Sequence, residues 1–328
     1  MTLDPMTRAV IDVMTEVYPK IGTEVHDAAE ARRILALAPS AGPGPTPVAR
    51  VEDRRVGEVP VRIYWPRETP PETPPETPPE TPPETPSEAP PGALLPVVLY
   101  FHGGGFCLCG LDTHDGVCRT LCAGADAIVV SVDYRLAPEH PYPAAVDDAY
   151  AVTTWISRHA KELGGDPARL AVAGDSAGGN LAAVVCLRAR DEQGPPIRFQ
   201  LLVYPCTDAG QDTPSHRENA EGYFLTAAHM RWYWDNYHPD HSRRAEPYSS
   251  PLGADLHDLP PALVLTAEYD PLRDEGEAYA DKLRAAGGKV ESVRYDGMFH
   301  GFFGLDAVLP AAKEAAERAC AALRAGLA

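Results

Sequence analysis

The chain has 328 residues, of which 44% are hydrophobic, so it can bury a large core in one or two domains. Its net charge of −18 at pH 7 argues against nucleic acid or anionic lipid as partners, because both need clustered Lys and Arg. No run of about 18 apolar residues is present, which argues against a membrane span.

The predicted elements alternate along most of the chain. Residues 1–45 are predicted to be helical, and strands are predicted at 59–65 and 96–101. Further strands follow at 127–134, 170–173, 199–204, 262–266 and 290–295, with helices at 143–163, 177–190, 272–286 and 307–326. This alternation predicts an α/β fold with a mostly parallel sheet covered on both faces. Residues 208–250 contain no predicted strand, and we expect them to cover one end of the sheet together with residues 1–45.

One segment between the first two strands differs in composition. Residues 68–83 are four copies of Glu-Thr-Pro-Pro, and two altered copies extend to residue 91. The segment has no large apolar side chain, and prolines and mutually repelling glutamates favour an extended chain. We predict a disordered insertion over 68–91; a ligand for a proline-binding module is the alternative.

Residues 174–178, Gly-Asp-Ser-Ala-Gly, fit the pattern G-x-S-x-G between a predicted strand and a predicted helix. In this context the sharp turn raises the serine hydroxyl above the sheet edge. The helix N-terminus also favours negative charge nearby. We therefore predict that Ser176 is a nucleophile, and a purely structural turn is the alternative.

A glycine-rich loop follows the strand at 96–101 and begins with His102, Gly103, Gly104 and Gly105. Backbone N–H groups that no side chain obstructs can stabilise the oxyanion of a tetrahedral intermediate. The loop precedes Ser176 by one strand–helix–strand–helix–strand unit, which favours this interpretation over a flexible turn.

A base and an acid to orient it should follow the serine in the order Ser, Asp, His. Asp270 and His300 both follow predicted strands, at the sheet edge where α/β active sites form. Asp274 is the rival acid, although it lies beyond Pro271 in a predicted helix. His238 and His241 are weaker candidates for the base because they lie within 208–250.

Together these motifs identify a family. Residues 102–106, 134–140, 174–180, 270–275 and 295–302 appear in the order and spacing of the hormone-sensitive-lipase-like esterases, the bacterial family IV carboxylesterases. The chain resembles this family over about residues 45–326, except for the Glu-Thr-Pro-Pro segment. The resemblance implies an α/β-hydrolase fold with a helical cap built from 1–45 and 208–250 on a core of 46–207 and 251–328.

The resemblance also implies how the site works. Ser176 would be the nucleophile, His300 the general base and acid, and Asp270 the residue that orients His300. The oxyanion donors would be the N–H groups of Gly104, Gly105 and Ala177. Short-to-medium acyl esters would be cleaved without a metal or cofactor, and many members of the family form homodimers.

Several questions stay open at this level. Trp232 and Tyr233 are candidates for an acyl pocket, with Trp234 and Tyr237 nearby, but the cluster equally suits the core of the cap. An amide or N-acetyl deacylase of a specialised metabolite could use the same triad. A ligand-binding receptor, like the related gibberellin receptors that lack the catalytic histidine, is disfavoured by His300. A role chiefly as a scaffold, through the Glu-Thr-Pro-Pro segment, is the remaining alternative.

The number of cysteines and the first residues of the chain indicate the cellular compartment in which we expect the protein. Residues 1–5 lack a basic segment followed by an apolar run, and the seven cysteines are an odd number, so we expect a cytoplasmic protein with reduced thiols. Cys107, Cys109, Cys118 and Cys122 match no common zinc-binding spacing and lie among apolar residues. We expect them to be packed thiols rather than metal ligands.

Overall fold

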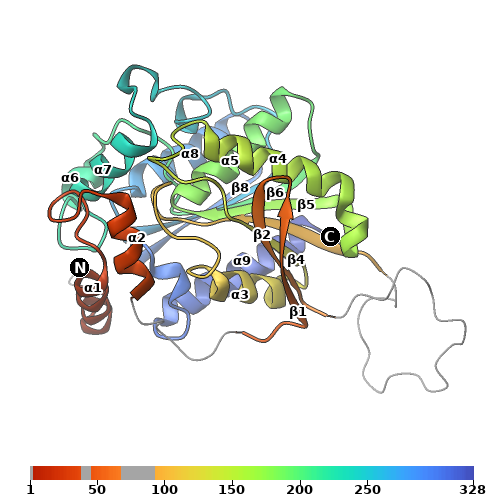
Figure 1. The fold of residues 1–328 in the computed structure, drawn as a ribbon, viewed down its shortest axis with the longest axis horizontal. Coiled ribbons are helices and arrows are strands. Elements are labelled where there is room, and N and C mark those ends of the chain that lie inside the picture. Colours follow the sequence, from red (N-terminus) through yellow and green to blue (C-terminus); the bar gives the residue numbers. More distant parts are fainter. Residues whose placement is uncertain (1–2, 38–45, 68–92) are drawn as a thin grey trace, which may run out of the picture.

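A computed structural model describes residues 3–37, 46–67 and 93–328 (Figure 1). Its centre is a single sheet of eight strands, in which the second strand runs antiparallel to both neighbours and the later pairs are parallel. The strand order across the sheet is β1 (Arg50–Val56), β2 (Val59–Trp65), β4 (Ile128–Val132), β3 (Leu95–Phe101), β5 (Gly165–Asp175), β6 (Ile197–Val203), β7 (Ala262–Tyr269) and β8 (Val290–Phe299).

Helices cover both faces of the sheet. Along β3 the side chains alternate, so that Val97 and Leu99 join one apolar core and Val98 and Tyr100 join the other. The first core includes residues of α4 (Ala144–His159), α5 (Ala177–Asp191) and α8 (Arg273–Ala285), and the second includes residues of α3 (Asp115–Ala125) and α9 (Pro310–Gly326).

The remaining helices gather at one end of the sheet. Figure 1 shows α1 and α2, from the N-terminal segment, on the same side of the molecule as α6 and α7, from residues 208–250. Their bounds are α1 (Pro5–Val17), α2 (Ala28–Leu37), α6 (Pro214–Glu218) and α7 (Ala227–Tyr237), and short 3₁₀ turns occur at Ala160–Leu163, His241–Arg243, Pro251–Gly253 and Phe302–Gly304.

The predicted alternation and the mostly parallel, doubly covered sheet are confirmed, and two elements were missed. β1 has the sequence Arg-Val-Glu-Asp-Arg-Arg-Val and is one of the two edge strands of this sheet, so it carries no apolar run. α3 is short and contains Gly116 and Gly124, which weaken a helical pattern. The predicted insertion over 68–91 lies outside the described residues.

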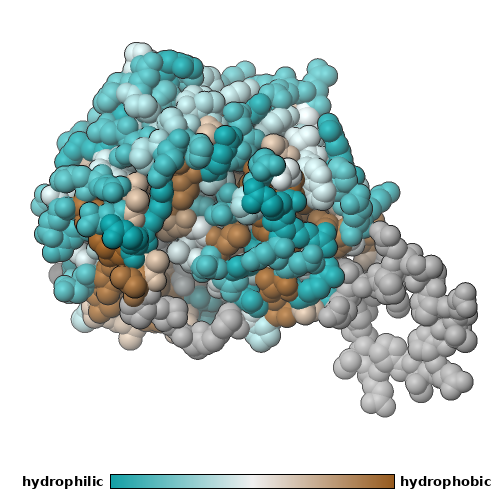
Figure 2. Space-filling view, in the orientation of Figure 1, coloured by the Kyte–Doolittle hydropathy of each residue, from teal (hydrophilic) through white to brown (hydrophobic). Residues whose placement is uncertain are grey.

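The face of the molecule drawn in Figure 2 is mainly hydrophilic, with apolar side chains showing near the N-terminal helices. Met6, Val13 and Val17 of α1 and Leu37 of α2 are large apolar side chains that remain exposed. Within the described part of the chain, no helix is both long enough and apolar enough to cross a membrane.

Candidate active site

Ser176 occupies the sharp turn between β5 and α5. Its backbone has φ 56° and ψ −118°, a strained combination for a residue other than glycine. A Cβ on Gly178 would lie 1.8 Å from the carbonyl oxygen of Phe101, so only glycine lets α5 pack this closely against the end of β3. The Ser176 N–H donates to the carbonyl of Val203, which ties the turn to β6.

Three side chains, each from a residue that follows a different strand of the sheet, meet at this turn. The Nε2 atom of His300 lies 2.9 Å from the Ser176 hydroxyl oxygen, and its Nδ1 atom lies 2.8 Å from an Asp270 carboxylate oxygen. Asp270 is fully buried and His300 is 7% exposed. The three residues therefore form a continuous hydrogen-bonded chain from hydroxyl to carboxylate.

Neighbouring groups fix the acid and the imidazole. The other Asp270 oxygen accepts the Leu272 N–H at 2.8 Å, and the Tyr204 ring lies 4.5 Å from the His300 ring. The rival acid Asp274 lies in α8, where it accepts the Ser215 N–H and pairs with Arg273. The structure thus brings Asp270, and not Asp274, against His300.

The glycine loop and the start of α5 border the same cavity as Ser176 and His300. Gly104, Gly105 and Ala177 all line it. The Ala177 N–H belongs to the first turn of α5, where amide groups have no acceptor within the helix. The residues predicted to hold an oxyanion therefore border the cavity that contains the serine.

His102, by contrast, does not line this cavity. Its ring stacks on Tyr134 with centroids 4.2 Å apart, and its Nδ1 atom lies 2.7 Å from the Gly103 carbonyl oxygen. Burial, together with the nearby His114, lowers the pKa of His102 to about 3, so its ring is uncharged at neutral pH. His102 thus packs beneath the glycine loop.

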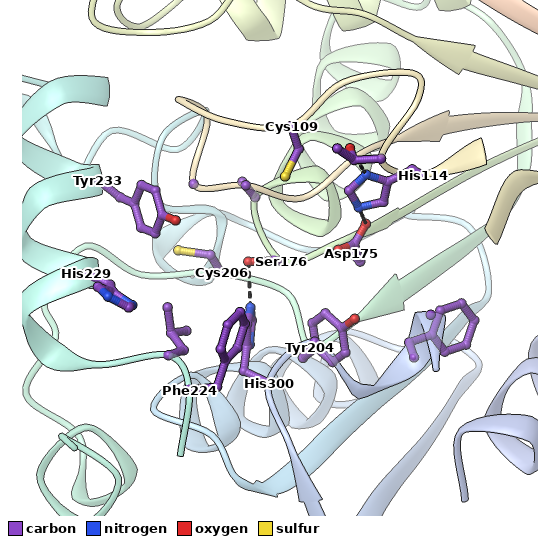
Figure 3. A pocket seen from close by; sticks show the side chains of 18 of the residues that line it. Cys109, His114, Asp175, Ser176, Tyr204, Cys206, Phe224, His229, Tyr233 and His300 are labelled. Carbon is purple, nitrogen blue, oxygen red and sulfur yellow. Dashed lines mark hydrogen bonds and ion pairs between the residues drawn. The ribbon is translucent and has the colours of Figure 1, made fainter. Parts of the chain in front are cut away.

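Asp175, the variable residue of the serine motif, was not singled out by the sequence analysis. Its Oδ1 atom accepts the Tyr100 hydroxyl at 2.6 Å and the Gly103 N–H at 3.0 Å, and it lies 3.3 Å from Nε2 of His114 (Figure 3). Burial alone would raise the pKa of Asp175, but His114 and the hydrogen bond from the Tyr100 hydroxyl hold it below its ordinary value. A carboxylate therefore joins the serine turn to the glycine loop. No motif indicated this, since its three partners precede it by 61 to 75 positions in the sequence.

The cavity at the serine has a volume of about 270 Å³ and two unlike sides. Near Asp175 it is polar, with Tyr100, Thr113 and His114. The opposite side is formed by mostly apolar side chains of the N-terminal and 208–250 segments, and Figure 3 shows Tyr233 and His229 projecting from α7 toward Ser176. The side chains on this side include Met14, Tyr18, Phe224, Leu225, His229, Met230, Tyr233 and Trp234.

The aromatic cluster of α7 divides between cavity and core. Tyr233 and Trp234 line the cavity at the serine, whereas Trp232, the other candidate for an acyl pocket, lies outside it. Successive residues of a helix point about 100° apart. Trp232 therefore faces the N-terminal segment, where its indole N–H donates to the carbonyl of His26. Tyr237 is buried and stacks on Phe106.

The thiols near the serine are poor nucleophiles. All seven cysteines are free, and Cys109 and Cys206 line the cavity. Burial raises the pKa of Cys109 to about 12 and that of Cys206 well above its usual range, so neither is a thiolate at neutral pH. Within the described residues, no group of three or more His, Cys, Asp or Glu side chains is arranged to hold a metal ion.

Comparison with known proteins gives the family. A model of the α/β-hydrolase fold matches residues 98–304. The carboxylesterase NlhH of Mycobacterium tuberculosis is 44% identical over 334 residues, covering 99% of this chain and 96% of the relative. This chain belongs to the hormone-sensitive-lipase-like carboxylesterases of the α/β-hydrolase fold. Esterase LipI of M. tuberculosis is 49% identical over 276 residues, covering 83% and 79% of the two chains.

Solved structures agree with this membership. A thermostable esterase from Pseudomonas putida superimposes with a TM-score of 0.87 at 39% identity, covering 99% of this chain and 98% of the other. The α/β-hydrolase fold and the membership expected from the motifs are therefore confirmed. As a carboxylesterase of this family, the protein hydrolyses carboxylic esters.

Proposed function

We propose that the protein hydrolyses short-to-medium acyl esters through an acyl-enzyme on Ser176, with His300 as base and acid and Asp270 orienting His300. The hydrogen-bonded chain of 2.9 Å and 2.8 Å from the serine hydroxyl to the buried carboxylate supports this most directly. The position of His300 also favours catalysis over a purely ligand-binding role.

The reaction would proceed in two halves. The Ser176 oxygen attacks the ester carbonyl carbon while Nε2 of His300 takes the hydroxyl proton, and the carbonyl oxygen becomes an oxyanion. We propose that the N–H groups of Gly104, Gly105 and Ala177 stabilise this oxyanion. The bond to the alcohol oxygen then breaks, and the departing oxygen receives the proton from His300. In the second half, water replaces the alcohol, the acid leaves, and the Ser176 hydroxyl is restored.

We further propose that residues 1–45 and 208–250 form a cap on a core of 46–207 and 251–328. Both parts of the cap contribute to the apolar side of the cavity, Tyr18 from the first and Tyr233 from the second. Their hydroxyl oxygens lie 2.6 Å apart and are hydrogen-bonded. A mostly apolar cavity of about 270 Å³ suits a short or medium acyl chain.

We also propose that the protein works in the cytoplasm, since its seven cysteines are free thiols.

We propose in addition that the protein forms a homodimer, as the family resemblance implies. Light scattering coupled to size-exclusion chromatography measures the oligomeric state directly. A mass equal to one chain would contradict the dimer.

Hydrolysis of p-nitrophenyl acetate, butyrate, octanoate and palmitate by wild type and Ser176→Ala tests the main proposal. We expect turnover of the shorter esters and loss of at least 10³-fold in the variant. A fluorophosphonate should label wild type and not Ser176→Ala. Full turnover by Ser176→Ala would contradict the assignment. A folded enzyme that turns over none of these esters would point instead to a specialised deacylase.

A further inference from the structure

A second cavity adjoins the one that holds Ser176. Its volume is about 180 Å³, and it lies between the end of α1, the loop that follows α1, and the start of α7. Three residues line both cavities and so form the wall between them: Tyr18, Phe224 and His229. The residues that line only the second cavity are Thr15, Pro19, Lys20, Thr23 and Thr226.

The wall consists of uncharged rings. The Tyr18 ring contacts the Phe224 ring edge-on, with centroids 5.0 Å apart, and lies 5.8 Å from the His229 ring. Burial lowers the pKa of His229 to about 4 and raises the pKa of Tyr18, so both are neutral at pH 7. An alkyl chain that passes between these rings would therefore meet no charge.

Phe224 is held in this wall by an unusual backbone. Its φ is 75°, in the left-handed region that bulky side chains rarely adopt. Gly222, two residues before it, also has a positive φ, of 89°, and the Leu225 N–H donates back to the Tyr223 carbonyl. Such strain persists where the surrounding structure requires a side chain in one place, often at a ligand site.

The Phe224 ring also lies close to the loop that contains His300. A Cβ on Gly301, the residue after His300, would lie 3.4 Å from the edge of this ring. The ring therefore stands between the catalytic histidine loop and the second cavity. A substrate chain that extends from Ser176 along the apolar side of the first cavity would end against it.

We propose that the second cavity is the distal part of an acyl-chain subsite and that Phe224 is the gate between its two parts. This inference rests on the proposed esterase function. Short acyl chains end in the first cavity, and the terminal methylene and methyl groups of longer chains displace the Phe224 ring and enter the second. The charged side chain on its lining, Lys20, pairs with Glu24 and is 56% exposed, and the other side chains that line the cavity are uncharged at pH 7.

Filling the second cavity is the first test. Thr15→Trp adds a large side chain to a residue that lines this cavity alone, and Glu16→Trp adds the same side chain to the next residue of α1, which lines neither. Each buried methylene contributes about fourfold to kcat/KM. We expect Thr15→Trp to lower kcat/KM for p-nitrophenyl laurate at least tenfold while p-nitrophenyl butyrate changes less than twofold. Glu16→Trp should change neither.

Opening the gate is the second test. Phe224→Ala should raise the laurate-to-butyrate ratio of kcat/KM about tenfold, because it joins the two cavities. Leu225→Ala removes a similar apolar group from the first cavity alone and should not produce this shift. In the Phe224→Ala background, Thr15→Trp should cancel the gain. Phe224→Leu, with a side chain of intermediate size, gives a smaller shift in the same direction and replaces the alanine variant if that is unstable.

The results separate this inference from the proposed function. If Thr15→Trp and Phe224→Ala change all chain lengths alike while Ser176→Ala is inactive, the subsite is wrong and the esterase mechanism stands. If Ser176→Ala retains turnover, the proposed function itself fails. If Leu225→Ala produces the same shift as Phe224→Ala, the volume of the first cavity decides chain length, and the gate is wrong.

Discussion

Replacing Gly105 by alanine tests how closely α7 constrains the glycine loop. A Cβ at this position would lie 2.1 Å from Cδ1 of Tyr233 and 2.4 Å from Cε1, whereas carbon atoms in contact are about 3.5 Å apart. The loop or the ring must therefore move by more than about 1 Å. A displacement of about 1 Å in a catalytic group costs on the order of 10²-fold in rate. Loss of one oxyanion donor has a similar or larger cost. We expect kcat/KM for p-nitrophenyl butyrate to fall by 10²-fold or more.

The effect of a left-handed backbone at Gly105 must be separated from the effect of the contact with Tyr233. Gly105 has φ 60°, so an alanine there also adopts a left-handed backbone, which costs about 1–2 kcal/mol. Gly57, in the turn between β1 and β2, has φ 58° and no atom within 4 Å of a Cβ. Gly57→Ala should therefore lower the free energy of unfolding by about the same amount and leave kcat/KM unchanged.

Removing the ring should relieve the collision. The double variant Gly105→Ala/Tyr233→Ala is expected to regain at least tenfold in kcat over Gly105→Ala, with Tyr233→Ala as the reference. Steady-state kinetics gives kcat and kcat/KM, and urea denaturation gives the free energy of unfolding. Both are measured for wild type, Gly105→Ala, Gly57→Ala, Tyr233→Ala and the double variant. Wild-type kcat/KM in Gly105→Ala, or no gain in the double variant, would refute the proposed contact between α7 and the glycine loop.

Two further predictions concern buried carboxyl groups. Because the pKa of Asp175 is lowered on folding, its carboxylate stabilises the protein above its ordinary pKa and loses this effect as pH falls through the folded value. Asp175→Asn should thus lower the free energy of unfolding by about 1–3 kcal/mol at pH 7, and this deficit should shrink as pH falls below the ordinary value of 3.8. The variant should also reduce kcat/KM about tenfold; equal stabilities at pH 7 would contradict this. Burial raises the pKa of Glu275 well above its ordinary value of 4.5, so wild type loses stability as pH rises through the raised pKa. Glu275→Gln keeps an oxygen for the Thr207 and Asp208 N–H groups and should show a flatter dependence of Tm on pH above pH 5. Identical slopes would show that folding does not raise the pKa of Glu275.

The sequence alone was sufficient to predict those features that depend on a local pattern of residues. Buried parallel strands such as β3 are continuous apolar runs because helices cover both faces. The Gly-Asp-Ser-Ala-Gly turn is specified within five residues, since the backbone geometry requires glycine at fixed places. Asp270 and His300 could be proposed because each follows a strand of a parallel sheet, and all such strands end at one edge. β1 escaped notice because an edge strand with charged, exposed side chains has no such pattern.

Only the tertiary structure decided which side chains meet across distant segments. The rotation of α7 about its axis sends Tyr233 toward Gly105 and Trp232 toward His26, and no local pattern specifies that rotation. Asp175 joins Tyr100, Gly103 and His114 because β3, β5 and α3 converge at one sheet edge. The wall formed by Tyr18, Phe224 and His229 combines residues more than 200 positions apart. Such contacts depend on how whole elements pack, which is why the chemistry could be predicted from the sequence and the shape of the substrate cavity could not.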